Sequence, residues 1–217
     1  MVTCFETTRY CMPYVKPSTS APLALPWVCE RYNCHPMLFL RKSNLERLPV
    51  AMSGVRMGER ALQIGMGDPS LAGAIAAKVG LSGHAVVAVS DDGTAVKARA
   101  AAEAAGVLVD VHVTPFDSLP FPGDSFDVIV LHAGAAALQP LEGTAAVAML
   151  RESHRILRTG GRMLVLEGGP RRVGGWWRSR QPPLGPETAA GVLGAAGFRA
   201  ARQLAEREGY RFTEGLK

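Results

Sequence analysis

Long apolar runs and concentrated charge are both missing from this sequence of 217 residues, and each absence narrows the classes of protein to which it can belong. No apolar run reaches the roughly 18 residues that a membrane-spanning helix needs. The first residues lack the basic-then-apolar order of a secretory leader. A net charge of +5, spread along the chain, does not demand nucleic acid as a partner. With 47% hydrophobic residues, we predict a cytoplasmic globular protein with one substantial core.

Cysteine is absent after residue 34, and the four cysteines are Cys4, Cys11, Cys29 and Cys34. A structural zinc site uses tightly spaced cysteine pairs, and only the last pair, with His35 beside it, is loosely suitable. Cytosolic chains rarely form disulfides. We therefore expect free thiols and no metal site, with a zinc site as the alternative.

The composition changes between the beginning of the chain and the rest. Proline, cysteine and tyrosine are frequent at first, and residues 16–26 read as an irregular linker, whereas alanine and glycine dominate later. We predict an irregular or disordered arm over residues 1–44 and a folded domain over residues 45–217. The segment SNLERL (43–48) begins with a residue suited to cap a short helix.

From residue 58 onward, apolar runs of strand length alternate with alanine-rich helical segments. Strands are predicted at 60–66, 84–90, 107–115, 126–134, 162–169, 199–207 and 209–216, and helices at 69–80, 94–106, 144–161 and 186–197. This alternation predicts an α/β fold with a mainly parallel sheet and helices on both faces. The near-continuous apolar character of VVAV and VIVL fits strands that are buried on both sides.

In such sheets the ligand lies at the carboxyl ends of the strands. The first of these ends carries the segment ALQIGMGDPSLAG (61–73), in which two glycines follow a strand and precede a helix. Gly65 and Gly67 let a ligand approach the backbone closely, although a tight turn with nothing bound would need them equally.

The order of segments resembles that of class I S-adenosylmethionine-dependent methyltransferases, most closely the small-molecule branch that contains quinone-biosynthesis enzymes. The resemblance covers roughly residues 45–217. Four pieces carry it: the loop ALQIGMGDP, the segment LPFPGDSFDVIVLHAG (119–134), the segment MLRESHRILRTGGRMLVLE (149–167), and LGAAGF with EREGYRFTEGLK (193–217).

The resemblance implies a Rossmann-like sheet of seven strands whose last strand is antiparallel. It also implies S-adenosyl-L-methionine as cofactor and a small-molecule acceptor that is methylated at oxygen or carbon. Methyl transfer depends mainly on holding the nucleophile in line with the methyl group and on excluding water. No fixed catalytic triad is therefore expected.

Three acidic residues serve the cofactor in that family, and this chain departs from the pattern at each position. Gln63 precedes the glycine loop, Ser90 ends the second strand, and Pro115 follows the third. A carboxylate on the ribose hydroxyls makes charge-assisted hydrogen bonds, which Ser90 replaces only in part. We expect neighbouring acids to compensate. The predicted cofactor-binding residues are Gln63, Gly65, Gly67, Asp68, Ser90, Asp91 and Asp117.

His132 ends the fourth strand and is the candidate general base, with a packed structural histidine as the alternative. Trp176, Trp177 and Arg178 follow the fifth strand and are the predicted acceptor-binding residues of a covering segment. Contact with RNA, or a plain surface loop, are the other interpretations of that segment. The LHAG sequence after the fourth strand differs from base-methylating relatives and argues against a nucleic-acid substrate.

Three functions remain open from the sequence. The first is a methyltransferase that acts on a small molecule. The second is a catalytically inactive descendant that serves as a binding or scaffold protein, and the third is a binder of another nucleotide. The altered acids separate the first two, because an active enzyme needs Asp91 or Asp92 to reach the ribose and a scaffold does not.

Overall fold

This computed structural model describes residues 47–133, 144–168 and 186–217. Every described residue belongs to the unit Arg41–Lys217. The predicted arm, the four cysteines and the segment Trp176–Arg178 lie outside the described residues. The boundary at residues 44 and 45 stays a prediction.

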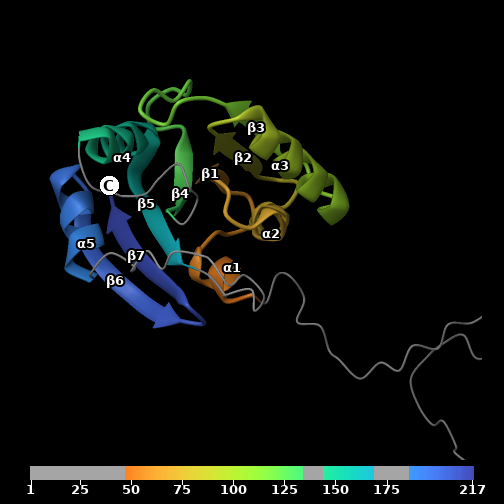
Figure 1. The fold of residues 1–217 in the computed structure, drawn as a ribbon. Coiled ribbons are helices and arrows are strands. Elements are labelled where there is room, and N and C mark those ends of the chain that lie inside the picture. The colour runs from red at the N-terminus through yellow and green to blue at the C-terminus, as the bar shows by residue number, and fades with distance from the viewer. Residues whose placement is uncertain (1–46, 134–143, 169–185) are drawn as a thin grey trace, which may run out of the picture. The chain divides into compact units, whose positions relative to one another are not determined.

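Seven strands form one sheet in the order β3-β2-β1-β4-β5-β7-β6 (Figure 1). They are β1 (Arg60–Ile64), β2 (His84–Val89), β3 (Asp110–Val113), β4 (Phe126–His132), β5 (Leu157–Gly168), β6 (Arg199–Arg207) and β7 (Tyr210–Leu216). The first five run parallel, whereas β7 is antiparallel to both β5 and β6. The predicted mainly parallel sheet with an antiparallel last strand is confirmed.

Helices cover both faces of this sheet, as predicted (Figure 1). They are α1 (Leu48–Met52), α2 (Pro69–Val79), α3 (Asp92–Ala105), α4 (Thr144–Ile156) and α5 (Pro186–Ala195). The first three pack on one face, and α4 and α5 pack on the other. Over the described ranges, no helix combines the length and the apolar character needed to cross a bilayer. A cytoplasmic location stays a prediction.

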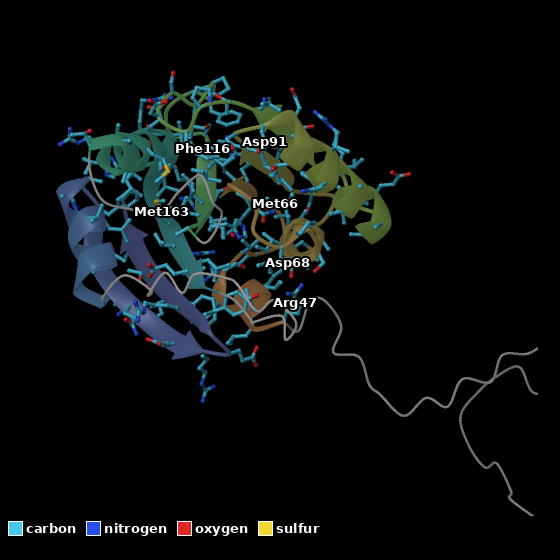
Figure 2. All side chains as sticks on the ribbon, in the orientation of Figure 1. Arg47, Met66, Asp68, Asp91, Phe116 and Met163 are labelled. Carbon is cyan, nitrogen blue, oxygen red and sulfur yellow. The ribbon has the colours of Figure 1, made fainter. Side chains whose placement is uncertain are left out.

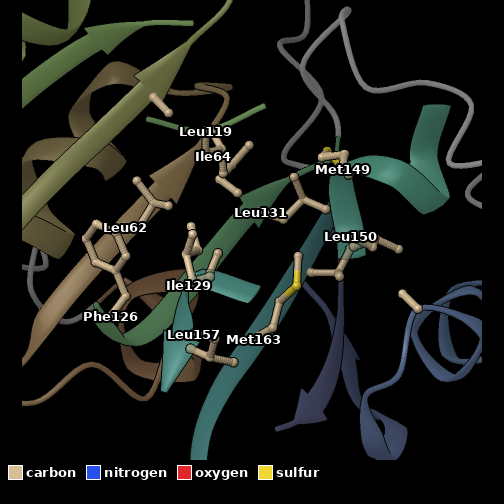
Figure 3. Close-up of a cluster of buried hydrophobic side chains, with 14 of the residues drawn as sticks. Leu62, Ile64, Leu119, Phe126, Ile129, Leu131, Met149, Leu150, Leu157 and Met163 are labelled. Carbon is tan, nitrogen blue, oxygen red and sulfur yellow. The ribbon is translucent and has the colours of Figure 1, made fainter. Parts of the chain in front are cut away.

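The central strands are buried on both sides, which explains their continuous apolar sequence. On β4, Ile129 and Leu131 join the cluster under α4 and α5, whereas Val128 and Val130 join the cluster under α1 and α2. Figure 3 shows the first of these clusters, in which Met163 of β5 also takes part. Because side chains alternate along a strand, a fully apolar strand must be covered twice.

Two helices begin at acidic caps, and both caps stand at the carboxyl edge of the sheet. Asp68 caps α2 by accepting a hydrogen bond from the backbone of Ser70, and Pro69 occupies the first turn. Asp91 caps α3 by accepting one from Thr94. The capping requirement thus places two carboxylates where a ligand of this fold is expected.

Two elements differ from the sequence prediction. The helix predicted over 144–161 ends at Ile156, and β5 begins at Leu157 because that residue pairs with Phe126 before the chain reaches its glycines. The short helix predicted at 43–48 begins only at Leu48, where Pro49 lies in its first turn.

Candidate active site

The loops that follow β1, β2, β3 and β4 open at one edge of the sheet. Backbone hydrogen bonds of 2.9 Å extend the pairing just beyond the strands: Gly65 donates to Ala88, Thr114 donates to Val89, and Ala133 donates to Leu166. The carboxyl ends of four parallel strands therefore stand level with one another. The structure thus gathers the candidate residues of these four loops at a single edge.

The loop after β1 has the shape that its two glycines predict. Gly65 has a φ of +71°, a left-handed conformation that a side chain would strain. Met66 is buried, and Figure 2 shows it on this loop. A Cβ added at Gly67 would meet no atom within 4 Å. Gly67 therefore leaves open space beside the loop backbone.

Gln63 does not face that open space. Its side chain is buried, and its Nε2 donates to the carbonyl oxygen of Ala72 in α2 at 3.0 Å. Its Oε1 lies 3.2 Å from Nε2 of His132 at the end of β4. Both ends of the amide are thus engaged within the protein, and Gln63 connects β1, β4 and α2.

The hydrogen-bond partners of Gln63 determine which ring nitrogen of His132 carries the hydrogen. The carbonyl of Ala72 can only accept, so the amide NH₂ faces it and Oε1 faces the imidazole. Nε2 of His132 must then carry the hydrogen, and Nδ1 keeps the lone pair. Burial lowers the pKa of His132 to about 4, although Asp68 opposes this. The imidazole is therefore neutral at pH 7.

Asp68 forms a second polar connection, to the segment that precedes α1. Its Oδ2 accepts from Nη2 of Arg47 at 2.6 Å, and Nη1 of Arg47 donates to Ser70 at the same distance. Burial opposes ionisation of Asp68, but hydrogen bonds from Arg47 and Ser70 outweigh it and hold its pKa below the ordinary value. Figure 2 shows Arg47 and Asp68 together at this edge. The ion pair fastens the start of the described domain to the glycine loop.

The end of β2 offers two exposed oxygen-bearing residues, Ser90 and Asp91. Asp91 accepts from the backbone and the hydroxyl of Thr94, both at 2.8 Å, and more weakly from Ser90 at 3.4 Å. A carboxylate offers about four lone-pair sites, so three are in use. If the Ser90 hydroxyl turns away, Asp91 can accept two hydrogen bonds from a ligand without giving up the cap.

The segment after β3 presents no acid at the expected place. Pro115 stands there, and the hydroxyl of Thr114 contacts the carbonyl oxygens of Pro115 and Ser118. Phe116 packs against the hydrophobic cluster, and Asp117 is exposed in the turn that follows (Figure 2). This loop thus supplies apolar surface together with one displaced carboxylate.

These residues fit S-adenosylmethionine at the glycine loop and at the end of β2, which is the second of the three positions where the family carries an acid. The open space at Gly67 gives a ligand access to the loop backbone, and the exposed pair Ser90 and Asp91 offers acceptors for hydroxyl groups. Gln63 does not contribute, because its amide is committed to Ala72 and His132. The role of Asp117 stays a prediction.

Some polar residues at this edge were not predicted from the sequence. Arg47 precedes the regular pattern and carries no motif. Glu167 ends the apolar run of β5, and an acid at the end of a predicted strand is the sequence feature that could have identified it. Arg211 lies inside a predicted strand, and no sequence feature marks it as a site residue. No set of three histidine, cysteine or acidic residues in the described ranges could hold a metal ion.

Two solved structures of methyltransferases share this architecture. A S-adenosylmethionine-dependent methyltransferase from Aquifex aeolicus superposes with a TM-score of 0.60 and 17% identity, over 77% of this chain and 87% of that one. A putative S-adenosylmethionine-dependent methyltransferase from Methanococcus maripaludis gives a TM-score of 0.58 and 17% identity, over 76% of this chain and 80% of that one. At such identities the likeness shows the fold.

Sequence comparison gives the family. Residues 62–165 match the family model described as a methyltransferase domain. The ubiquinone/menaquinone biosynthesis C-methyltransferase of Ectopseudomonas mendocina is 35% identical over 124 residues, which are 56% of this chain and 46% of the relative. That of Vibrio vulnificus is 32% identical with the same coverage. The chain spans about half the length of these relatives. Residues 62–165 thus carry a domain of the class I S-adenosylmethionine-dependent methyltransferases, and the chain resembles their quinone-biosynthesis branch.

Proposed function

We propose that this chain transfers a methyl group from S-adenosylmethionine to a carbon atom of a small aromatic acceptor of the hydroquinone type. The observation that carries the proposal is the open edge where the Gly65–Gly67 loop stands beside Ser90 and Asp91. The relatives named above are carbon methyltransferases of quinone biosynthesis, which supports the acceptor class. Oxygen methylation is the alternative within the same function.

The chain's residues would contribute mainly by binding and orientation. The backbone at Gly67 allows close approach, and Ser90 with Asp91 would accept hydrogen bonds from hydroxyl groups of the bound cofactor. Bound S-adenosylmethionine supplies an electrophilic methyl group. Met66 and Phe116 pack into hydrophobic clusters beside this edge and would hold the two loops in place, which favours transfer between positioned reactants.

His132 is the proposed proton acceptor, and its state favours carbon over oxygen. With Nε2 protonated toward Gln63, only Nδ1 can take a proton. A pKa of about 4 makes it a weak base. A weak base does not remove the proton of a phenol, whose pKa is near 10 as for tyrosine. It does suffice for the acidic proton on a ring carbon that has just been methylated.

Calorimetric titration of the full chain with S-adenosylmethionine and with S-adenosylhomocysteine tests the first half of the proposal. We expect micromolar dissociation constants for both compounds. Anaerobic incubation with methyl-labelled S-adenosylmethionine and 1,4-dihydroxynaphthalene then tests transfer. The product's fragmentation pattern distinguishes a methyl group on carbon from one on oxygen.

The outcomes separate the functions left open by the sequence. Absence of binding up to millimolar cofactor would contradict the proposal and favour a scaffold role. Binding without transfer to any electron-rich ring would retain the family and reject the acceptor class. Transfer to oxygen would reject the assignment of carbon alone.

A further inference from the structure

A cluster of buried polar side chains lies on β5, β7 and β6, away from the glycine loop. The sheet register pairs Glu167 with Arg211 and Arg211 with Glu206. It also pairs Thr213 with Gln203. Side chains that are paired directly across antiparallel strands share a face, and so do residues two apart on one strand. All five side chains therefore point to one side of the sheet.

That side is the one covered by α4 and α5. Val165, which pairs with Thr213, belongs to the same hydrophobic cluster as Leu193 of α5. Glu167, Arg211 and Thr213 are at most 8% exposed, and Thr213 is fully buried. These three side chains are thus buried, whereas Gln203 is partly buried and Glu206 is exposed at the rim of the cluster.

Four atoms of this cluster lack a hydrogen-bond partner among the described residues. They are Oε2 of Glu167, Nη1 of Arg211, Oγ1 of Thr213 and Oε1 of Gln203. Arg211 uses its other nitrogens on Glu206, at 3.2 and 3.3 Å. Buried polar atoms in native proteins nearly always have a hydrogen-bond partner. Four unpaired atoms in one cluster therefore favour the binding of a polar ligand there.

The donor or acceptor character of these four atoms determines which class of ligand fits. Nη1 of Arg211 donates, the Thr213 hydroxyl donates or accepts, and the oxygens of Glu167 and Gln203 accept. An anion would satisfy Arg211 but would face two acceptors without a hydrogen to give. A cationic ammonium group would leave Arg211 unpaired. A neutral hydroxyl fits, because it donates one hydrogen bond and accepts from two donors.

The position suits an acceptor that extends from the cofactor edge. Glu167 is the penultimate residue of β5, at the carboxyl end where ligands of this fold bind. In the strand order, β5 stands two places from β1 and β7 three places. At about 4.8 Å per strand, the cluster lies roughly 10–14 Å across the sheet from the glycine loop. A two-ring acceptor can bridge much of that span.

We propose that Glu167, Arg211, Thr213 and Gln203 form a binding site for a ring hydroxyl of the methyl acceptor. The inference rests on the proposed function for the identity of the acceptor as a hydroquinone. In this site Arg211 and Thr213 donate to the hydroxyl oxygen, and Glu167 or Gln203 accepts its hydrogen. These are binding residues that fix the acceptor's orientation.

The sharpest test removes one hydroxyl without changing shape. Anaerobic calorimetry measures binding of 1,4-dihydroxynaphthalene to the full chain, with and without S-adenosylhomocysteine. Thr213→Val should raise the dissociation constant at least fivefold, and Thr213→Ser should restore it to within twofold of the wild type. Thr213→Val should also raise the melting temperature of the free protein, because it removes a buried hydroxyl that has no partner there.

Ser153→Ala is the matched control. Its hydroxyl is also fully buried, but it already donates to the carbonyl oxygen of Met149 in α4. Its loss should leave the dissociation constant of the probe unchanged. A dissociation constant that is equal in wild type and Thr213→Val would overturn the proposal and assign the cluster to ordered water.

Two further outcomes separate this inference from the proposed function. If the wild type binds S-adenosylhomocysteine but not the probe, the hydroxyl site and the hydroquinone acceptor class are rejected, whereas methyl transfer from S-adenosylmethionine stands. If the wild type binds the probe in a Thr213-dependent way but does not bind S-adenosylhomocysteine, the site stands and the methyltransferase proposal fails.

Discussion

Oε1 of Gln63 and Nε2 of His132 lie 3.2 Å apart and join the ends of β1 and β4 beneath the candidate active site. The resemblance to methyltransferases leads one to expect an acid at position 63, facing the cofactor. The amide instead serves the interior, because its NH₂ group must meet the carbonyl of Ala72. A carboxylate could not make that hydrogen bond, which gives a physical reason for glutamine at this position.

Gln63→Glu therefore places the acid that the family carries at this position, but it should lower the stability of the fold. A carboxylate oxygen would face the Ala72 carbonyl in a buried place, so we expect the free energy of unfolding to fall by about 1–3 kcal/mol at pH 7.5. Urea unfolding followed by circular dichroism measures the change. Gln63→Met, which removes both hydrogen bonds without adding charge, is the comparison, and equal stability of wild type and Gln63→Glu would contradict the described contact.

The buried imidazole of His132 should make stability depend on pH. Its pKa lies at about 4 in the folded protein and near 6.5 when unfolded, so between these values the unfolded chain binds the extra proton. Stability is thus fully present above pH 6.5 and is lost as the pH falls toward 4, by roughly 3 kcal/mol for this group.

The variant His132→Phe should flatten the unfolding free energy between pH 6.5 and 4 relative to the wild type, as measured by urea unfolding at several pH values. Ser153→Ala, which changes a buried side chain that does not titrate, is the control and should keep the wild-type slope. An identical slope in His132→Phe would show that this imidazole is not the group responsible.

Asp91 has two tasks that a substitution by asparagine separates. Asparagine caps a helix about as well as aspartate, so α3 should keep its N-terminus and the melting temperature should hardly change. The loss of the carboxylate should nevertheless weaken S-adenosylmethionine binding at least tenfold in calorimetry. Glu103→Gln, at an exposed acid near the other end of α3, is the control; a dissociation constant equal to that of the wild type in Asp91→Asn would remove Asp91 from the site.

The ion pair between Arg47 and Asp68 should contribute less than the cap that Asp68 provides. The Arg47 and Asp68 side chains are 23% and 40% exposed, so solvent screens the pair and Arg47→Met should cost less than about 1 kcal/mol. Asp68→Ala also removes the α2 cap and should cost about 1 kcal/mol more. Thermal unfolding of both variants and of Asp68→Asn, which keeps a cap, checks this order.

Much of the fold follows from local sequence. The apolar runs HAVVAV and FDVIVLH predict buried parallel strands, and Gly106 ends α3 with a φ of +65°, as its position predicts. The start of β5 at Leu157 could not be predicted in this way. The residues LRTGG look like a helix end followed by a turn, and only the pairing of Leu157 with Phe126 and the hydrogen bonds of Gly160 and Gly161 with Lys217 make them part of a strand.

The candidate site was predictable in its location but not in its internal partners. Strand ends marked Gly65, Ser90 and His132, because the carboxyl edge of a parallel sheet is set by chain order. The contact between Gln63 and His132 joins residues that are far apart in the sequence, and no local pattern encodes it. The same holds for Glu167 and Arg211, which only the pairing of β5 with β7 brings together.

Two of the segments that most resemble methyltransferases meet in space. Glu152 of α4 accepts from the backbone of Leu119, and Arg155 donates to the carbonyl oxygens of Leu119 and Phe121, so a single helical turn clamps the segment that leads into β4. This clamp touches neither the glycine loop nor the end of β2. A descendant that had abandoned methyl transfer would still need it to fold, and would keep its family likeness in these segments. Glu152 and Arg155 therefore account for the family likeness of these segments, whereas the proposed cofactor contacts lie at other residues, Ser90 and Asp91.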